Sequence, residues 1–358
     1  MKRIVIALAA AAFAAAATAQ LPQYRVEVIA DRVLALTGRT QLAEDGSSVY
    51  YADIEDEGYY YHSSRTGLIH YSAGGYAVGI QSYKNGQFVG KRTNDPNLLT
   101  SNPIRCVTGG EIELLNQDHW PAGGAHDFSE SGYIVGQLSG FANGIGVIWR
   151  PDGSRIELGT WIPTNINNNG KFSGGREVGH ISNPTQLRHL TVPGIPTNAY
   201  GIHDVNENDM VLGSYARNDI RSLAIWDAND VLVHQLTESF WASSMNDSMT
   251  VVGRNTLFTG TYGMIWSPAS GLVDINTLLL PSSQEFHIDV GSSINNSGQF
   301  LAYATRSGVT YTVLLHPVPE PATLLALGTG SAVLLRKRRK RRTEAGTEFI
   351  TLIDLINR

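Results

Sequence analysis

The chain has 358 residues, of which 42% are apolar and 16% are charged, and it contains 37 glycines. An average soluble domain carries about 25% charged residues and about 7% glycine, so this composition excludes a coiled coil, a long helical bundle and a charged disordered protein. Residues 20–316 contain 17 basic and 28 acidic residues, a net charge of −11. That balance predicts no nucleic-acid partner, because phosphate contacts need a basic face.

The chain has one cysteine, Cys106. A single thiol excludes an internal disulfide framework and a cysteine-based zinc or iron–sulfur site. We expect Cys106 to be a small buried hydrophobic residue, with pairing between two molecules as the alternative.

Residues 1–19 are predicted to be a signal peptide. Two basic residues at the start precede an almost wholly apolar stretch, and Ala17 and Ala19 form a small-residue cleavage site before Gln20. The apolar stretch is shorter than the roughly 20 residues of a membrane-spanning helix. We therefore expect export and cleavage before Gln20, and an uncleaved N-terminal anchor is the alternative.

Residues 20–316 contain a repeated unit. It consists of a turn rich in Asn, Asp and Ser, followed by a short alternating apolar run that usually closes on Gly. The copies are 83–90, 129–136, 167–174, 206–213, 246–253 and 295–302. A further, degenerate unit is expected before residue 80. A period of about 40 residues with several short strands is typical of a β-propeller, in which each unit is one blade.

The length of the repeat region sets the number of blades. At about 40–45 residues per blade, residues 20–316 predict an all-β domain of six to seven four-stranded blades. A β-solenoid and a pair of β-sandwiches are the alternatives.

Three tryptophans follow the turns in register. Trp149, Trp226 and Trp266 each lie 17 residues after the fourth position of their repeat. Equal spacing places the three side chains at equivalent points, where we expect them to pack between neighbouring units. A platform on which a ligand stacks is the alternative.

The turn, the run closing on Gly and the Ile-Trp step together resemble the HAF repeat of extracellular bacterial proteins. The resemblance is clearest in 131–136, 206–213 and 246–253, and 158–160 fits the Leu-Gly-Thr ending of that repeat. It implies an extracellular location and carries no assigned chemistry.

Two His-Asp pairs, His126-Asp127 and His203-Asp204, are the most catalytic-looking residues. They come just before the repeat turn in strand-like segments, so we expect them to cap or brace the turn, with a metal site as the alternative. The segment from Asp204 opens like a calcium loop but has Asp209 and Tyr215 where Gly and Glu belong. Calcium at blade edges stays an alternative. No catalytic residue and no cofactor is predicted.

Three consecutive tyrosines, residues 59–61, lie in a strand-like run. Strand geometry predicts that Tyr60 faces the side opposite to Tyr59 and Tyr61. We expect these rings to pack in the core, and an exposed surface for carbohydrate or protein is the alternative.

The C-terminal part has three successive segments after residue 316. A proline-bounded motif comes first, an apolar stretch at 322–335 follows it, and a run of basic residues comes last. The motif residues are Val318, Pro319, Glu320 and Pro321, and the basic residues are Arg336, Lys337, Arg338, Arg339, Lys340, Arg341 and Arg342. A basic block beside an apolar span stays on the cytoplasmic side, which predicts a short membrane helix with the repeat domain outside.

This order over residues 317–342 resembles the PEP-CTERM sorting signal of Gram-negative bacteria. The resemblance implies an exosortase-type membrane protease as partner, an intermediate in the inner membrane, and final placement at the cell surface or outside the cell. The expected setting is the extracellular matrix or biofilm. Two features depart from the pattern: the apolar stretch is short and contains Gly328 and Gly330, and the chain continues through an extension at 343–358.

The first functional hypothesis is an exported, non-catalytic binding or structural module, with polysaccharide or another envelope protein as partner. The alternative is a secreted propeller enzyme, a glycosidase or lyase acting on polysaccharide. That enzyme would need two or more carboxylates converging at one end of the central channel, about 5–10 Å apart.

Overall fold

The computed structural model describes residues 21–31, 42–51, 58–74, 76–93, 100–140, 143–218, 220–255 and 261–318. One compact unit spans Tyr24–His316, and a second comprises Met1–Gln23 with Pro317–Arg358, of which only 21–23 and 317–318 are described. The predicted signal peptide, the apolar stretch, the basic run and the extension lie outside the described residues. Within the described part of the chain, no helix is long and apolar enough to cross a membrane.

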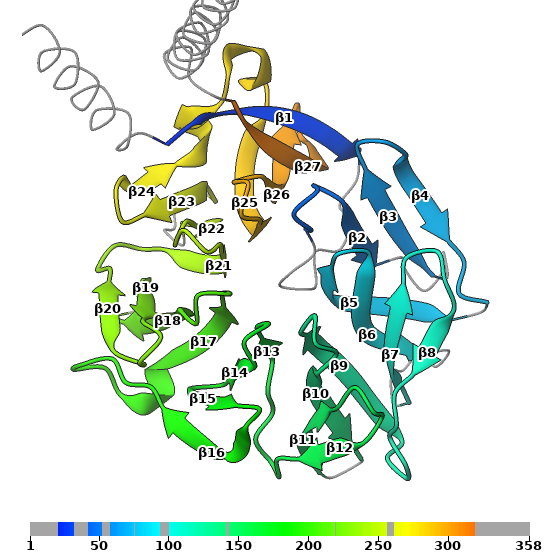
Figure 1. Cartoon of the computed structure of the whole chain (residues 1–358). Coiled ribbons are helices and arrows are strands. Elements are labelled where there is room, and N and C mark those ends of the chain that lie inside the picture. The colour runs from blue at the N-terminus through cyan, green and yellow to red at the C-terminus, as the bar shows by residue number, and fades with distance from the viewer. Residues whose placement is uncertain are drawn as a thin grey trace, which may run out of the picture. The chain divides into compact units, whose positions relative to one another are not determined.

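The unit Tyr24–His316 is a β-propeller of seven antiparallel sheets placed in chain order around a central axis (Figure 1). This confirms the predicted all-β propeller and fixes the blade number at seven, so the solenoid and the sandwich pair are wrong. The sheets are called blades 1 to 7 below. The regular helices among the described residues are three short 3-10 helices: η1 (Thr197–Ala199), η2 (Ile275–Leu278) and η3 (Pro281–Ser283).

The strands of each blade follow one another from the central axis outwards. Blade 1 contains β2 (Ser48–Tyr51), β3 (Tyr59–Ser63) and β4 (Gly67–Tyr71). Blade 2 contains β5 (Ala77–Lys84), β6 (Gln87–Thr93), β7 (Asn102–Val107) and β8 (Ile112–Leu114). Blade 3 contains β9 (Ala122–Phe128), β10 (Ile134–Ser139), β11 (Gly144–Trp149) and β12 (Arg155–Glu157). Blade 4 contains β13 (Asn165–Ile166), β14 (Lys171–Gly174), β15 (Glu177–His180) and β16 (Asn183–His189). Blade 5 contains β17 (Tyr200–Val205), β18 (Val211–Arg217), β19 (Ile220–Trp226) and β20 (Leu232–Gln235). Blade 6 contains β21 (Trp241–Met245), β22 (Val251–Arg254), β23 (Gly263–Ser267) and β24 (Gly271–Asp274). Blade 7 contains β25 (His287–Ile294), β26 (Phe300–Arg306), β27 (Val309–Val318) and β1 (Gln23–Ala30).

Blade 1 is the degenerate unit expected before residue 80. Its described strands number three, and Leu42 forms an isolated antiparallel bridge with Ser48 of β2. Leu42 thus occupies the edge of β2 where the other blades carry their inner strand.

The ring of blades is closed by pairing the two ends of the unit. β1, the first strand of the chain, lies beside β27, the last, at the outer edge of blade 7. The side chains of Glu27 and His316 are 2.6 Å apart across this junction. Pairing β1 with β27 in blade 7 brings the two ends of the unit into one sheet and leaves no open seam in the ring.

The repeated Gly and Trp of the sequence pattern fit against each other. A Cβ added to Gly136 would lie 2.9 Å from the ring of Trp149, and one added to Gly213 would lie 2.8 Å from the ring of Trp226. The carbonyl oxygens of Gly124 and Gly201 in the first strands lie closer still, at 2.2 and 2.7 Å, so in blades 3 and 5 the first-strand backbone and the third-strand indole together leave no room for a Cβ.

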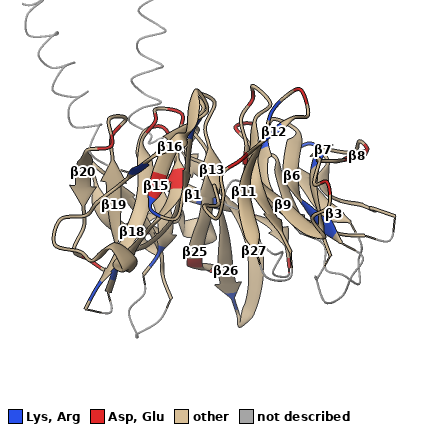
Figure 2. Cartoon of the chain, turned by 90° about the horizontal axis from the view of Figure 1, so that it is seen from below, with Lys and Arg blue, Asp and Glu red and all other residues tan. Residues whose placement is uncertain are grey.

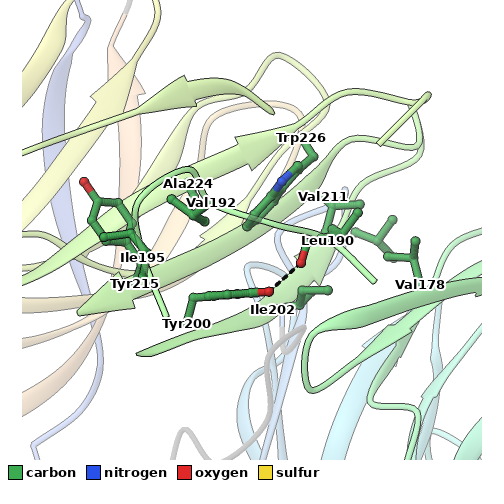
Figure 3. Close-up of a cluster of buried hydrophobic side chains, with 11 residues drawn as sticks. Val178, Leu190, Val192, Ile195, Tyr200, Ile202, Val211, Tyr215, Ala224 and Trp226 are labelled. Atoms are coloured by element: carbon green, nitrogen blue, oxygen red, sulfur yellow. Dashed lines mark hydrogen bonds between the residues drawn. The ribbon is translucent and has the colours of Figure 1, made fainter. Parts of the chain in front are cut away.

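The three tryptophans pack between blades, as predicted. Trp149, Trp226 and Trp266 are 2%, 1% and 5% exposed. Trp226 of blade 5 lies in one cluster with Val178 of blade 4 (Figure 3). Its indole N–H donates to the carbonyl of Thr191, in the segment that leads from blade 4 into blade 5. The structural interpretation of these residues is therefore confirmed.

The tyrosine run and the cysteine also occupy core positions. Tyr59 and Tyr61 pack with a cluster that includes blade 2, whereas Tyr60 packs on the other side with residues of blade 7. The predicted alternation is confirmed, and both sides of the run are covered by neighbouring blades. Cys106 is buried, and burial raises the pKa of its thiol.

Two faces of the propeller differ in their connections. The face called the turn face carries the tight turns between first and second strands and between third and fourth strands. The face called the loop face carries the remaining connections. Seen from the side, several loops along the turn face are acidic, whereas basic residues lie at strand ends on the loop face (Figure 2).

Candidate functional site

A pocket of about 220 Å³ opens at the centre of the turn face. It is lined by the ends of the inner strands and by the turns that follow them. Six blades contribute the second residue of the turn and blade 2 contributes the third, Asn85, and these seven residues are called the central ring. They are Glu44, Asn85, Glu130, Asn168, Glu207, Asp247 and Asn296. Four carboxylates and three amides therefore meet at one end of the propeller axis.

The central ring is a chain of hydrogen bonds from blade to blade. The backbone N–H of Glu130 donates to Asn168 Oδ1 at 2.7 Å, and that of Asn168 donates to Glu207 Oε2 at 2.7 Å. The same contact then joins Glu207 to Asp247, Asp247 to Asn296, and Asn296 to Glu44, at 2.8 to 3.1 Å. The last of these contacts joins blade 7 to blade 1.

A second ladder runs beneath the central ring. The first residue of the turn is Asn in blades 4 to 7, and its amide donates to the backbone carbonyl of the next blade. The contacts run from Asn167 to Asn206, Asn206 to Asn246, Asn246 to Asn295 and Asn295 to Ala43. The side-chain oxygen of each Asn accepts backbone N–H groups of its own turn, as Asn206 does from Asn208 and Met210. One residue thus shapes the turn and joins two blades.

The two His-Asp pairs have a shared geometric origin. In blade 5, Gly213 pairs with Ile202 and Leu212 pairs with Asp204, so His203 is the extra residue of a β-bulge. His126 occupies the same place in blade 3. A bulge redirects the side chain that follows it, and here that side chain is the aspartate.

Both aspartates use their carboxylates to join blades. Asp127 Oδ2 accepts the backbone N–H of Ile166 in blade 4 at 2.8 Å, and Oδ1 accepts the hydroxyl of Ser82 in blade 2 at 2.6 Å. Asp204 Oδ2 accepts the backbone N–H of Met245 in blade 6 at 3.2 Å. The aspartates thus brace neighbouring blades, which differs from the predicted capping or bracing of the repeat turn itself.

Lys84 supplies a positive charge within the pocket lining. Its ammonium group lies 3.1 Å from Asp127 Oδ1 and donates to the carbonyls of Phe128 and Ile166. One side chain therefore ties blade 2 to blades 3 and 4. Because its donors point at these protein acceptors, Lys84 neutralises part of the acidic lining from within.

The electrostatics of the pocket act most strongly on Glu207. Burial raises the pKa of this carboxyl above its ordinary value near 4.5, and the nearby carboxylates of Asp247 and Asp127 act in the same direction. The N–H of Asn168 and the charge of Lys84 oppose the rise. Glu207 is thus the ring acid whose ionisation the fold disfavours.

The chemistry open to this pocket follows from how its acids are used. A propeller enzyme would need converging carboxylates, and the carboxylates do converge here. Each ring acid also accepts at least one hydrogen bond that holds a neighbouring blade in place. Within the described ranges, no group of three or more His, Cys, Asp or Glu side chains is arranged to hold a metal ion.

Of the predicted delivery residues, Val318 lies within the described part of the chain. Val318 is the last residue of β27, while Pro319, Glu320 and Pro321, the basic run and the cleavage site at Ala19 and Gln20 lie outside the described residues. The central ring itself was missed by sequence reasoning. Its signal is present in five of the six repeat copies, where the second turn residue is Asn, Asp or Glu, whereas the copy 83–90 has Lys84 there.

The fold is shared with proteins of very different sequence. The structure of a streptogramin B lyase aligns with a TM-score of 0.54 at 10% identity, over 83% of this chain and 98% of that one. An oligogalacturonate lyase from Vibrio parahaemolyticus aligns with a TM-score of 0.53 at 11% identity, over 84% of this chain and 98% of that one. At such identities the likeness shows the propeller fold alone.

The sequence comparisons address the end of the chain. No curated protein matches the chain in sequence, and no comparison supports the resemblance to HAF repeats. Residues 317–340 match the PEP-CTERM protein-sorting motif, which confirms the sorting-signal resemblance for that segment. The chain therefore combines a seven-bladed β-propeller with a C-terminal PEP-CTERM sorting motif.

Proposed function

We propose that this protein is an exported β-propeller that acts at the cell surface or in the extracellular matrix as a non-catalytic binding or structural module. Residues 1–19 act as the signal peptide, 20–316 form the working domain, and 317–342 act as the sorting signal. The observation that carries the proposal is the match of 317–340 to the sorting motif directly after the closed propeller.

The sorting motif implies an exosortase-type membrane protease as partner. In the proposed route, the apolar stretch 322–335 halts in the inner membrane with the basic run on the cytoplasmic side. Cleavage near Pro319, Glu320 and Pro321 then frees the propeller, and the basic run stays behind. The extension 343–358 is lost together with the basic run.

The non-catalytic part of the proposal rests on the central pocket. Its four ring carboxylates accept hydrogen bonds that hold the blades together, and Lys84 is engaged with protein acceptors. Groups committed to bracing serve poorly as proton donors and nucleophiles, since moving them would disturb the packing of two blades. We expect the propeller to bind polysaccharide or another envelope protein.

One observation favours the second candidate, a secreted enzyme acting on polysaccharide. The carboxyl of Glu207 has a raised pKa and shares its pocket with Glu130 and Asp247. A general acid needs a carboxyl whose pKa is raised, because it must hold a proton to donate. Both structural relatives described above are lyases in name, but their identity to this chain of 10–11% carries only the fold.

Mass spectrometry of the exported protein tests the proposed route. We expect a chain that begins at Gln20 and lacks the basic run Arg336–Arg342. Release of the full chain with this run intact would contradict processing of the sorting signal.

A variant of the motif sharpens this test. Glu320→Ala is expected to leave precursor in the membrane fraction, whereas Glu344→Ala in the extension is a matched control that is processed normally. Equal release of both variants would show that the motif is not read.

A further inference from the structure

A second pocket, of about 280 Å³, lies on the loop face at blade 5. It is lined by residues 198–201, His203, 214–216 and Arg221, from η1 and strands β17, β18 and β19. The pocket is separate from the central pocket and shares no lining residue with it. Its volume lies close to the lower end of small-ligand pockets, which is about 300 Å³.

Arg221 gives this pocket an exposed positive charge. The guanidinium carbon of Arg221 lies 4.1 Å from the centre of the Trp241 ring, and that of Arg254 lies 4.5 Å from the same centre. Trp241 pairs directly with Arg254 across β21 and β22, and the N–H of Phe240 donates to the carbonyl of Arg221. The backbone of blades 5 and 6 therefore fixes two arginines on one indole.

Neither guanidinium is neutralised within the described part of the chain. No carboxylate there lies within 4.0 Å of Arg221 or Arg254, and neither side chain donates a hydrogen bond to a described residue. Stacking on an aromatic ring stabilises each cation but leaves its N–H edge open. The two arginines thus present unused donors at the loop face.

Blade 7 provides an internal comparison. Arg306, at the end of β26, stacks over Phe286 and Tyr311 at 4.7 and 4.9 Å. There the guanidinium is paired with Glu285 at 2.9 Å and donates to the hydroxyl of Tyr311. The stack of blade 7 is therefore a self-contained structural contact, whereas the stack at blades 5 and 6 lacks its anion.

The remaining lining of the pocket combines small residues with a few polar side chains. His203 Nε2 and Ser214 Oγ are 2.5 Å apart, and Asn198 adds an amide. The hydroxyls of Tyr200 and Tyr215 donate to the carbonyls of Leu190 and Leu236, and both rings are buried in the core of blade 5, so these two side chains wall the pocket. The imidazole, hydroxyl and amide groups of the lining suit a ligand rich in hydroxyls.

We propose that this pocket binds a uronic acid unit of a polysaccharide, with Arg221 holding the sugar carboxylate. A guanidinium fork matches a carboxylate with two parallel hydrogen bonds, while His203, Ser214 and Asn198 face the sugar hydroxyls. The site has one lining cation, which suits one carboxylate at a chain end or branch and not a row of phosphates. This inference rests on the proposed binding function and names its ligand class.

Calorimetric titration of the mature exported protein with trigalacturonic acid tests the proposal. The methyl ester of the same trisaccharide is the matched neutral ligand. We expect the acid to bind and the ester to bind at least ten-fold more weakly. Arg221→Gln should weaken binding of the acid about ten-fold to a hundred-fold, the range of a charged hydrogen bond. Arg306→Gln is the control variant and should bind as the wild type does.

Several results would overturn the proposal. Equal binding of acid and ester, or unchanged binding by the Arg221→Gln variant, would contradict the proposed contact between Arg221 and the sugar carboxylate. Binding of inorganic phosphate with the same dependence on Arg221, and no binding of the trisaccharide, would remove the sugar. Because Arg221 is an exposed side chain, an unchanged melting temperature is expected and checks the fold of the variant.

The same titration separates this inference from the proposed function. Protein that is exported and trimmed but does not bind trigalacturonic acid overturns only the inference. Protein that binds the trisaccharide through Arg221 and then shortens it overturns only the non-catalytic function, which mass spectrometry of the ligand after titration detects.

Discussion

The turn face and the loop face use their charged groups in opposite ways. On the turn face, the acids of the central ring accept hydrogen bonds from neighbouring blades, and Lys84 donates to protein carbonyls. On the loop face, Arg221 and Arg254 stack on Trp241 and pair with no described carboxylate. The same fold thus commits the acids at the axis to its own assembly and leaves Arg221 and Arg254 without a described carboxylate, whereas Arg306 on the loop face is paired with Glu285.

This difference shows that convergence of side chains is weak support for a catalytic site in a propeller. Seven equivalent turns meet at the axis by symmetry, so any polar residue of the repeat becomes a ring at the centre. What separates bracing from function is whether a group already has its partner within the fold.

The largest expected effect is a loss of stability on removing a tryptophan of the packed interior, compared with removing one on the loop face. Trp226→Ala should lower the free energy of unfolding by about 3–5 kcal/mol, because the indole is 1% exposed between blades 4 and 5. Urea denaturation measures the change. Trp241→Ala, at a half-buried ring of the loop face, is the matched control and should cost clearly less. Equal losses would mean that the two rings have equivalent environments.

A smaller effect is expected in the ladder beneath the central ring. Asn246→Ala removes the donor to the Asn295 carbonyl and the acceptor for the N–H groups of Ser248 and Thr250. Leaving the buried Asn295 carbonyl and the two partly buried N–H groups unpaired should cost about 1–3 kcal/mol in the free energy of unfolding.

Asn208→Ala is the control for this experiment. Asn208 is exposed and its amide makes one contact, to the carbonyl of Asp247. Its loss should stay below about 1 kcal/mol. An Asn246→Ala variant with an unchanged free energy of unfolding would contradict the bracing role of the repeated Asn.

The smallest effect is a pH-dependent change at Glu207. Its pKa is raised in the folded protein, so the folded form binds a proton more tightly than the unfolded form, and ionisation at higher pH lowers stability. Glu207→Gln keeps an acceptor for the N–H of Asn168 without the charge. We expect the variant to be more stable than the wild type at pH 7, by less than about 1 kcal/mol for a partly exposed group.

The pH profile of this gain is diagnostic. It should shrink as the pH falls through the folded-state pKa and vanish below about 4.5, where the carboxyl is protonated in both states. Chemical denaturation at pH 7 and pH 4 measures it. A loss of stability at pH 7, or a gain that persists at pH 4, would contradict the electrostatic account of the pocket.

The fold could be predicted from the sequence because the repeat marks blades 2 to 7. The turn residues set the period, and the step from the turn to Trp149, Trp226 or Trp266 sets the register of the third strand. Blade 1 lacks these marks, so only its existence was predicted. The closure by β1 escaped prediction because strand pairing between the two ends of the chain leaves no local signal.

The sites were harder to predict for a physical reason. The His-Asp pairs could be assigned to a structural role from their place before the turn, but the bulge that redirects Asp127 and Asp204 appears only in the pairing register. The loop-face pocket joins Arg221 and Trp241 from different blades. Whether an arginine meets a carboxylate, as Arg306 does, depends on contacts between connections that the sequence pattern does not fix.

The account's central claim is that the acids at the axis hold the blades together and perform no chemistry. The most direct test incubates the mature protein with uronate and neutral polysaccharides and measures chain length by mass spectrometry. We expect every polysaccharide to be recovered at its original length. Shortened chains that disappear with Glu207→Gln, while that variant stays folded, would contradict the claim.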